Sequence, residues 1–404
     1  MAVQARQTVL LGNLLAGGAR TLEQYCKRGG GGALARAHSM APESLIEQIE
    51  ASGLRGRGGA GFPTGRKWRA VAAEAASQKF VVANGDEGDP GAFSDRFLME
   101  DDPFRLIEAM AIAAHAVGAS RGVIYLRKEY PAAAQSLDSA LREARSAGWL
   151  GDSFDIELTL GQGSYICGEE TAMLNSIEER RPEVRPRPPQ ITAQGLFRKP
   201  TLVNNVETLC AVPWIVEHGG AAYAELGFSH SRGTKLLSLN SLFRRPGLYE
   251  VEFGIPLRSV VEDLGGGLHR GQLKALMVGG PLAGLLPPRL LDTPLGHEEM
   301  QALGAAVGHG GVIAFADDTS LAEIVEQVFR FGAYESCGKC TPCHLGTPVI
   351  ERMFADGARR DLARYRDLIH ALAATSLCGH GRGLAEFAHS LERHFAGELA
   401  TCFA

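Results

Sequence analysis

Long apolar runs and an excess of basic side chains are both missing from this sequence. The longest apolar stretches, such as EAMAIAAHAVGA, are too short to cross a bilayer, so we expect no direct membrane insertion. The formal net charge is −5 at pH 7, which offers no electrostatic basis for binding nucleic acid. A disulfide pattern is missing too, because half of the eight cysteines form one ligand-like group. This cysteine usage predicts a reducing compartment, the cytoplasm.

The length and the glycine content indicate several domains that carry ligand-binding loops. The 404 residues exceed what one hydrophobic core usually serves. The 50 glycines, many of them clustered, indicate loops where the backbone closely approaches a ligand. We expect an N-terminal helical segment over 1–52, an α/β domain over 53–230, a small β module over 231–316 and a helical region over 317–404.

Strand-like and helix-like segments alternate through the expected α/β domain. Strands are predicted at 79–84, 121–127 and 155–160, with amphipathic helices at 103–119 and 132–148 between them. This order predicts βαβ units and a mainly parallel sheet covered by helices. Binding loops should then lie at the carboxyl ends of the strands.

The order of strand-like and helix-like segments changes after residue 233. Segments TKLLSLN, GLYEVEFG, PLRSVVEDLGGG, LKALMVGG and GVIAFA give a ββαββ order, which looks like a small β-grasp module. From residue 317 onward, apolar residues recur at i, i+3 and i+4, which predicts helices.

A glycine-rich loop, GRGGAG, covers Gly56 to Gly61. It matches the G-x-G-x-x-G pattern, but a helix-like segment precedes it, so an ordinary Rossmann dinucleotide site is not expected. Its backbone N–H groups could still bind phosphate. A flexible linker is the alternative, although it does not explain the embedded Phe62 and Trp68. The cations expected to add positive charge are Arg55, Arg57, Arg66 and Lys67.

Two further loops carry polar side chains suited to ligand binding. ANGDEGDPGAFSDR follows the first strand and gathers acids that could accept hydrogen bonds from sugar hydroxyls; the alternatives are a solvated turn or a divalent-metal site. In KPTLVNNVETL, Asn204 and Asn205 could cap a helix or contact a heteroaromatic ring. Glu169 and Glu170 begin a predicted helix, where capping alone would explain them. The acids of the first loop are Asp86, Glu87, Asp89 and Asp95.

The strongest signal is the segment ESCGKCTPCHLGT together with a distant TSLCGHG. Structural zinc sites usually consist of two separated cysteine pairs. Three closely spaced cysteines and a remote fourth instead resemble the ligand set of a [4Fe–4S] cluster, with zinc as the alternative. The predicted ligands are Cys337, Cys340, Cys343 and Cys378. The neighbouring His344 and His380 are expected to be surface residues rather than ligands.

Taken together, these motifs resemble those of the NADH-binding flavoprotein subunit of respiratory complex I. They also resemble the diaphorase subunits of NAD-dependent formate dehydrogenases and NAD(P)-linked hydrogenases. GLRGRGGAGFPTGRKW, NGDEGDPGAFSDR, GSYICGEETAMLNSIE, RPRPP, KPTLVNNVETL and ESCGKCTPC with SLCGHG occur in the family's order over nearly the whole chain. The resemblance implies an α/β fold with a Rossmann-like FMN-binding domain, a β-grasp (SLBB, ubiquitin-like) domain and a C-terminal helical bundle carrying the cluster.

The resemblance also implies the cofactors and the residues that hold them. FMN, NAD(H) and one [4Fe–4S] cluster are implied, and no side chain is required as a catalytic acid or base. The implied FMN contacts are Gly56, Arg57, Gly58, Gly59, Ala60, Gly61, Gly65, Lys67, Asn84, Asp86, Glu87, Tyr165, Gly168, Glu169, Asn204, Asn205 and Thr208. The implied NADH contacts are Phe62, Asp89 and Glu170.

The implied function is hydride exchange between NAD(H) and FMN, followed by single-electron transfer through the cluster. Ala70 and Gln190 stand where the complex I branch tends to have adenine-stacking Phe, so a non-catalytic scaffold that no longer binds dinucleotide is the alternative. A zinc-stabilised binding module is a third possibility. The expected partners are a thioredoxin-like 2Fe–2S small subunit and an iron–sulfur/molybdopterin or hydrogenase-type large subunit.

Overall fold

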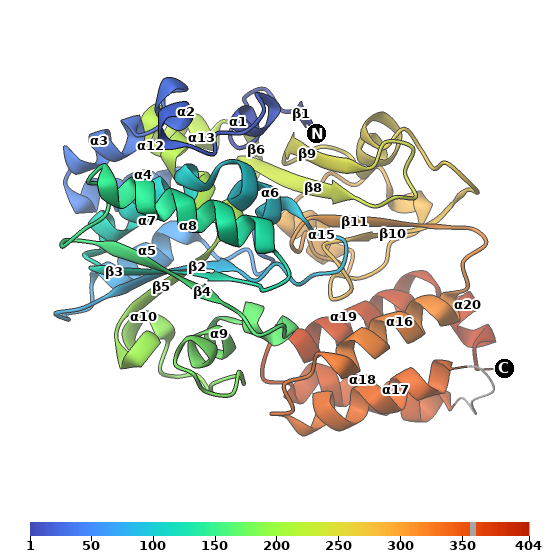
Figure 1. The fold of residues 1–404 in the computed structure, drawn as a ribbon. Helices are drawn as coiled ribbons and strands as arrows, with labels where there is room; N and C mark the ends of the chain where they lie inside the picture. The colour runs from blue at the N-terminus through green and yellow to red at the C-terminus, as the bar shows by residue number, and fades with distance from the viewer. Residues whose placement is uncertain (356–360, 404) are drawn as a thin grey trace.

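A four-stranded parallel sheet forms the centre of the larger lobe (Figure 1). The computed structural model describes residues 1–355 and 361–403. The strands run in the order β4–β3–β2–β5, and each neighbouring pair is parallel. This confirms the predicted α/β architecture, although the sequence analysis did not identify the last strand. The strands are β2 (Phe80–Gly85), β3 (Arg121–Leu126), β4 (Asp155–Leu160) and β5 (Thr201–Asn205).

Alternate residues of the central strand β2 pack into different hydrophobic layers. Val81 and Ala83 join the large cluster that includes helix α7 (Pro103–Val117), whereas Phe80 and Val82 join a smaller cluster with residues of α9 (Glu170–Ile177). Figure 1 accordingly shows α7 and α8 on one face of the sheet and α9 and α10 on the other. This is the side-chain alternation of a strand that is buried on both faces.

Further helices complete this lobe. After β5 the chain forms two consecutive helices, and Pro213 lies in the first turn of the second. The N-terminal helices are α1 (Gly12–Leu15), α2 (Leu22–Lys27), α3 (Gly32–His38), α4 (Pro42–Ala51) and α5 (Thr64–Ala72). The later ones are α6 (Ser94–Asp101), α8 (Pro131–Ser146), η1 (Tyr165–Gly168), α10 (Ile191–Gln194), η2 (Leu196–Arg198), α11 (Val206–Cys210), α12 (Val212–His218) and α13 (Gly220–Ala224).

A second sheet has the order β1–β9–β8–β11–β10. Its middle pair, β8 and β11, is parallel, and each of these strands pairs antiparallel with its outer neighbour. The first residues of the chain, predicted as part of a helical segment, instead form strand β1, which pairs with β9. The elements are β1 (Ala2–Gln4), β8 (Thr234–Leu239), β9 (Gly247–Glu252), α14 (Leu257–Ser259), η3 (Val260–Leu264), β10 (Leu273–Val278), η4 (Pro288–Leu290), α15 (His297–Ala302) and β11 (Gly311–Ala316), preceded by a hairpin of β6 (Gly227–Phe228) and β7 (Ser231–Arg232).

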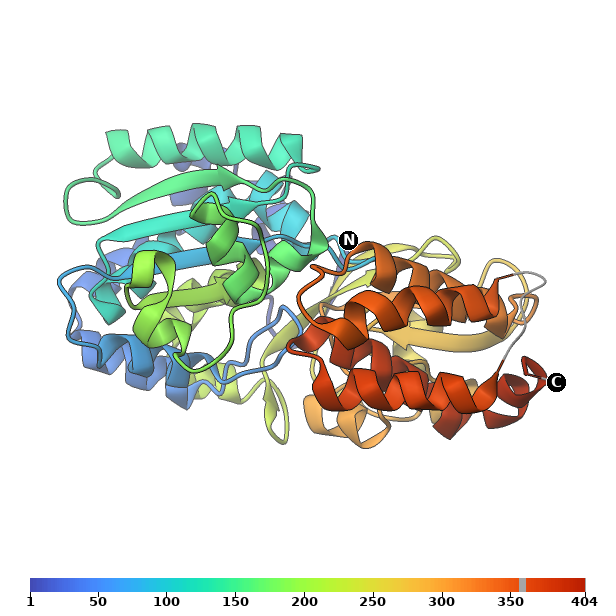
Figure 2. The same cartoon turned by 90° about the horizontal axis from the view of Figure 1, so that it is seen from below.

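The C-terminal region is helical, as predicted, and lies beside the second sheet (Figure 2). Residues 356–360 and 404 of the predicted 317–404 region lie outside the described residues. No helix in the described part of the chain is both long and apolar enough to span a membrane. The helices are α16 (Leu321–Tyr334), η5 (Pro342–Gly346), α17 (Thr347–Phe354), α18 (Leu362–Thr375), α19 (Gly379–His394) and α20 (Ala396–Thr401).

Candidate functional site

The glycine-rich loop lies against the carboxyl end of β5. The backbone N–H of Arg57 donates to the hydroxyl of Thr208 over 2.8 Å. A Cβ atom at Gly58 would lie only 2.9 Å from the Cβ of Asn205, so this contact requires glycine. The loop thus meets the asparagine motif at a strand end, as expected for a ligand site in a parallel sheet.

Two residues of helix α5 connect this loop to the other motifs. The ammonium of Lys67 pairs with Glu170 and donates to the backbone carbonyl of Val203 over 2.9 Å. The indole N–H of Trp68 donates to the side-chain oxygen of Asn204 over 3.1 Å. The helix therefore brings the glutamate and asparagine motifs to one place.

The acidic loop after β2 meets the segment η1. The side-chain amide of Asn84 donates to the carbonyl of Gly168 over 2.8 Å, and the hydroxyl of Tyr165 donates to Asp89 over 2.6 Å. A Cβ atom at Gly168 would lie 3.3 Å from the carbonyl oxygen of Asp86. These contacts bring Asn84, Asp89, Tyr165 and Gly168 together at the strand ends, whereas Glu87 is fully buried.

Asp86 lies at these strand ends with part of its hydrogen-bonding capacity unused. Burial raises the pKa of its carboxyl to about 7, although the positive charge of Arg127 acts to lower it. One carboxyl oxygen, Oδ2, is buried and has no hydrogen-bond partner among the described residues. An unsatisfied buried acceptor is costly, so a ligand that donates a hydroxyl would stabilise it. The ribityl hydroxyls of FMN fit this requirement.

Several predicted contacts prove to have structural roles. The Arg57 side chain is 2% exposed, donates to the hydroxyl of Tyr223 over 2.9 Å and lies over the ring of Phe253. Its charge is therefore directed to the second sheet and is not available to a phosphate in the glycine loop. Arg55 likewise pairs with Glu298 of α15. Neither guanidinium is therefore free to contact a ligand in the loop, which leaves the backbone N–H groups as the predicted phosphate donors.

Helix capping accounts for part of the glutamate and asparagine motifs. Glu169 accepts hydrogen bonds from the N–H groups of Thr171 and Ala172 at the start of α9. Asn205 caps α11 by accepting from the N–H of Thr208 over 3.2 Å. Gly65 also has a packing role, because a Cβ there would lie 2.4 Å from the Cγ of Glu50. These roles fix the backbone of the site without excluding ligand contact.

Phe62 and Glu170 border the more open side of the site. The Phe62 ring is 48% exposed, with the Arg66 guanidinium 5.9 Å from its centroid. Ala70 and Gln190 are also exposed. Arg187 donates to Glu169 over 2.9 Å and lies 3.5 Å from Glu170, which ties the segment before Gln190 to the site.

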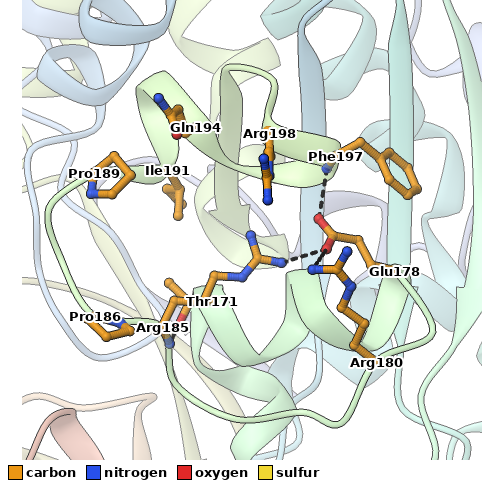
Figure 3. A pocket seen from close by; sticks show the side chains of 10 residues that line it. All are labelled: Thr171, Glu178, Arg180, Arg185, Pro186, Pro189, Ile191, Gln194, Phe197 and Arg198. Carbon is orange, nitrogen blue, oxygen red and sulfur yellow. Dashed lines mark hydrogen bonds and ion pairs between the residues drawn. The ribbon is translucent and has the colours of Figure 1, made fainter.

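The segment from Arg180 to Gln190 curves around a cavity of about 470 Å³ (Figure 3). Glu178 lines this cavity, pairs with Arg185 at 2.9 Å and accepts the N–H of Phe197 over 2.8 Å. These bonds hold the proline-rich segment against α9 and η2. The segment is free of helix up to Gln190, because prolines lack the backbone N–H and clash with the preceding turn of a helix.

The four predicted cluster ligands come together at one end of the helical region. Cys337, Cys340 and Cys343 lie between α16 and α17, and Cys378 precedes α19. None of the four is in a disulfide. Burial, reinforced by the charges of the other three thiols, raises the pKa of the Cys343 thiol to about 12. Thiolates this close together repel one another, and a bound cation would stabilise them.

The spacing of the thiols distinguishes between the two metal hypotheses. The only described group of three or more potential ligand atoms within 4.8 Å of one another is Glu87, Asp95 and His309. No three of the four thiol sulfurs therefore lie within 4.8 Å of one another, whereas Zn–S bonds of about 2.3 Å would hold all the sulfurs around a single zinc within that distance. The wider spacing fits a multinuclear cluster.

Tyr165 lies between the acidic loop and the cysteine-bearing helices. Its ring centroid lies 4.9 Å from that of Phe331 and 5.6 Å from that of His380. Its backbone N–H donates to Glu335 over 2.9 Å. His380 was expected at the surface but is 4% exposed and bonds the carbonyl of Gly332 over 2.8 Å. The sequence carries no signal for this contact, because the residues it joins are far apart in the chain.

The comparisons with known proteins agree with this geometry. A family model described as the Nuo51 FMN-binding domain matches residues 49–214, and one described as the NADH-ubiquinone oxidoreductase-F iron-sulfur binding region matches residues 323–402. The chain is 39% identical over 391 residues to the NADP-reducing hydrogenase subunit HndC of Solidesulfovibrio fructosivorans, covering 94% of this chain and 80% of that protein. It is 39% identical over 407 residues to an NADH-quinone oxidoreductase subunit of Rhizobium meliloti (strain 1021), covering 97% of each.

A solved structure also resembles this chain in fold and in sequence. The chain matches a chain of the NAD⁺-reducing [NiFe]-hydrogenase in the H₂-reduced state with a TM-score of 0.85 and 37% identity. The match covers 92% of this chain and 65% of that chain. This chain therefore belongs to the family of FMN-binding, [4Fe–4S]-binding NADH oxidoreductase subunits.

Proposed function

We propose that this chain transfers electrons between NAD(H) and a one-electron partner, with FMN held by the loops at the strand ends and the cluster held by the four cysteines. When bound, the flavin supplies two-electron chemistry with nicotinamide and the cluster supplies one-electron chemistry. The observation that carries the proposal is the contact of Tyr165 with both regions: its hydroxyl bonds Asp89, and its ring contacts His380 beside Cys378.

The chain's own residues would bind and orient the flavin. The backbone of Gly56 to Gly61 would hold its phosphate, and the unsatisfied carboxyl of Asp86 would accept a ribityl hydroxyl. Lys67 would add positive charge to the site, since its ammonium already lies between Glu170 and the β5 backbone. No acid or base is needed, so the protein's contribution is positioning and electrostatics.

The proposal is tested by adding FMN to the flavin-free protein and following the quenching of flavin fluorescence. Saturable one-to-one binding supports it. A protein that carries an iron–sulfur absorption spectrum but does not bind flavin would contradict it and favour the scaffold alternative. A colourless protein that binds zinc would favour the zinc-module alternative.

Asp89 and Glu170 are proposed to orient the nicotinamide ribose. Replacing either with Ala removes a charged hydrogen-bond acceptor, and such bonds contribute about 1.5–3 kcal/mol. We expect KM for NADH to rise roughly tenfold or more in each variant. Steady-state kinetics with an artificial hydride acceptor measure this change.

The flavin content provides the control for these two variants. FMN should remain bound in both, because neither side chain is proposed to contact it. Unchanged KM for NADH in both variants would remove Asp89 and Glu170 from the dinucleotide site.

Ala70 and Gln190 provide the second test of the dinucleotide site. Both are exposed. The resemblance implies that the complex I branch tends to have Phe at these two positions, so Ala70→Phe or Gln190→Phe should restore a stacking partner for adenine. An aromatic pair contributes about 0.5–1.5 kcal/mol, which corresponds to roughly two- to twelvefold tighter NAD(H) binding. Isothermal titration of the FMN-loaded protein with NAD⁺, which does not reduce the flavin, measures the gain. Ala147→Phe, at an exposed position just after α8, is the control. No gain at either position would show that another group already covers the adenine.

We propose that the second sheet is a β-grasp module. Its central strands, β8 and β11, are parallel, each pairs with an antiparallel outer neighbour, and one helical segment crosses the sheet.

The partner subunits are also part of the proposal. Relatives named as hydrogenase and quinone-oxidoreductase subunits support a role in a multisubunit complex. We propose a thioredoxin-like 2Fe–2S small subunit and a larger iron–sulfur subunit, of the molybdopterin or hydrogenase type, as partners.

A further inference from the structure

The second sheet contacts both proposed flavin-binding loops through one short segment, Gly308 to Gly310. Gly308 forms an antiparallel bridge with Gly59 of the glycine loop. Gly308 and Gly310 have φ values of 55° and 91°, in the left-handed region that favours glycine. His309 between them is 7% exposed. This backbone places an imidazole of one module inside the acidic loop of the other.

His309 binds the carboxylates of the acidic loop. Its Nε2–H donates to Asp95 over 2.8 Å and lies 3.4 Å from Glu87, while Nδ1 lies 3.9 Å from Asp89. Asp95 and Glu87 are fully buried. Three acids gathered in a buried loop require a positive charge nearby. The imidazolium of His309 supplies it.

A metal ion at Glu87, Asp95 and His309 is the competing explanation. The oxygens of Glu87 already accept from the Ser94 hydroxyl, from two backbone N–H groups and from the Tyr130 hydroxyl. Asp95 accepts from the Glu207 N–H over 3.0 Å in addition to His309. A histidine nitrogen that donates to a carboxylate has no lone pair left for a metal. A proton, rather than a cation, therefore holds this group together.

The contacts of Asp95 extend the effect of His309 to the strand end of β5. Its carboxylate accepts from the side-chain amide of Asn205 over 2.6 Å, and Asn205 lies against Gly58. The carbonyl of His309 accepts from Lys235 over 3.1 Å, and Lys235 is paired with Glu207. One histidine thus connects the acidic loop, the glycine loop and the asparagine motif.

We propose that His309 is a positioning residue for the flavin site: through Asp95 and Glu87 it holds the acidic loop and Asn205 in the geometry that binds FMN. The inference rests on the proposed function, because the loops it holds are the proposed flavin contacts. His309 itself acts through these carboxylates rather than on the cofactor.

The charge of His309 gives the proposal a pH dependence. Burial alone would lower the pKa of His309, but the neighbouring charges of Asp95, Glu87 and Asp89 raise it to about 9. The contribution of the charged form is therefore complete below the ordinary pKa and is lost as the pH rises through about 9. The other charged groups close to this network are Lys235 and Glu207 behind His309, and Arg127 at the Glu87 carbonyl.

The test compares His309→Leu with His309→Gln, which keeps a neutral N–H donor. We expect His309→Leu to raise the FMN dissociation constant of the flavin-free protein at least about tenfold. His309→Gln should have a smaller effect and should lose the weakening of FMN binding that the native protein shows as pH rises through about 9. His269→Gln, an exposed histidine in the same sheet module, is the matched control and should bind FMN like the native protein.

Hydrogen exchange of the flavin-free protein provides a second measurement that does not depend on FMN. In His309→Leu, the amides of residues 86–96 and 205–208 should exchange faster, while those of β3 and β4 should not change. Native FMN affinity in His309→Leu with native exchange of these loops would overturn the inference. Faster exchange spread evenly over both sheets would also overturn it, because it would indicate general destabilisation. A native protein that binds no FMN would instead overturn the proposed function.

Discussion

Cys378→Ser is expected to lose most of its iron and sulfide and to stop passing electrons to one-electron acceptors. Cys378 approaches the other three cysteines from the start of α19, a separate segment of the helical region. A four-thiolate cluster that loses one ligand becomes labile, because a serine hydroxyl is a far weaker ligand for iron at neutral pH. Iron and sulfide analysis, together with a one-electron acceptor assay, measures the loss.

The flavin site should survive this change, because its proposed contacts lie on other elements. FMN binding and the NADH-dependent reduction of hydride-accepting dyes should therefore persist in Cys378→Ser. Cys26→Ser, an exposed cysteine of α2, is the control and should keep the full cluster. A full cluster in Cys378→Ser would show that the ligand assignment is wrong.

Gly58→Val is expected to weaken FMN binding strongly while leaving the cluster in place. The new Cβ would lie 2.9 Å from the Cβ of Asn205, so either the glycine loop or the asparagine must move. Overpacking of this kind costs about 1–3 kcal/mol, which corresponds to roughly 5- to 150-fold in affinity if the strain is relieved by moving the loop. Fluorescence titration of the flavin-free protein measures the change.

Gly151→Val provides the matched control, because a Cβ there meets no atom within 4 Å. It should bind FMN like the native protein and should contain the same amount of iron. Native FMN affinity in Gly58→Val would mean that the glycine loop does not closely approach the flavin.

The sequence predicted the parallel sheet because periodicity and strand–helix alternation are local properties. It did not identify β5, whose TLVNN sequence is short and ends in two asparagines, nor β1, whose pairing with β9 joins residues far apart in the chain. Pairing partners of this kind depend on tertiary contacts that no local pattern records.

In the candidate site too, contacts between distant parts of the chain could not be predicted from local sequence patterns. The motifs located the loops, but the direction of the Arg57 side chain and the burial of His309 and His380 follow from packing between modules. An isolated histidine, whether in a loop such as His309 or at the start of a helix such as His380, looks like a surface residue in a sequence. In the structure, His309 enters a buried acidic loop and His380 packs against Tyr165.

The most direct test of the account is an anaerobic titration of the FMN-loaded, cluster-containing protein with NADH, followed by optical and electron paramagnetic resonance spectroscopy. The account predicts that the flavin absorption bleaches on addition of NADH. It also predicts that a paramagnetic signal of the reduced cluster appears after addition of a stronger reductant. The flavin bleaching is the decisive observation. A protein that holds both cofactors but shows no flavin bleaching with excess NADH would contradict the account.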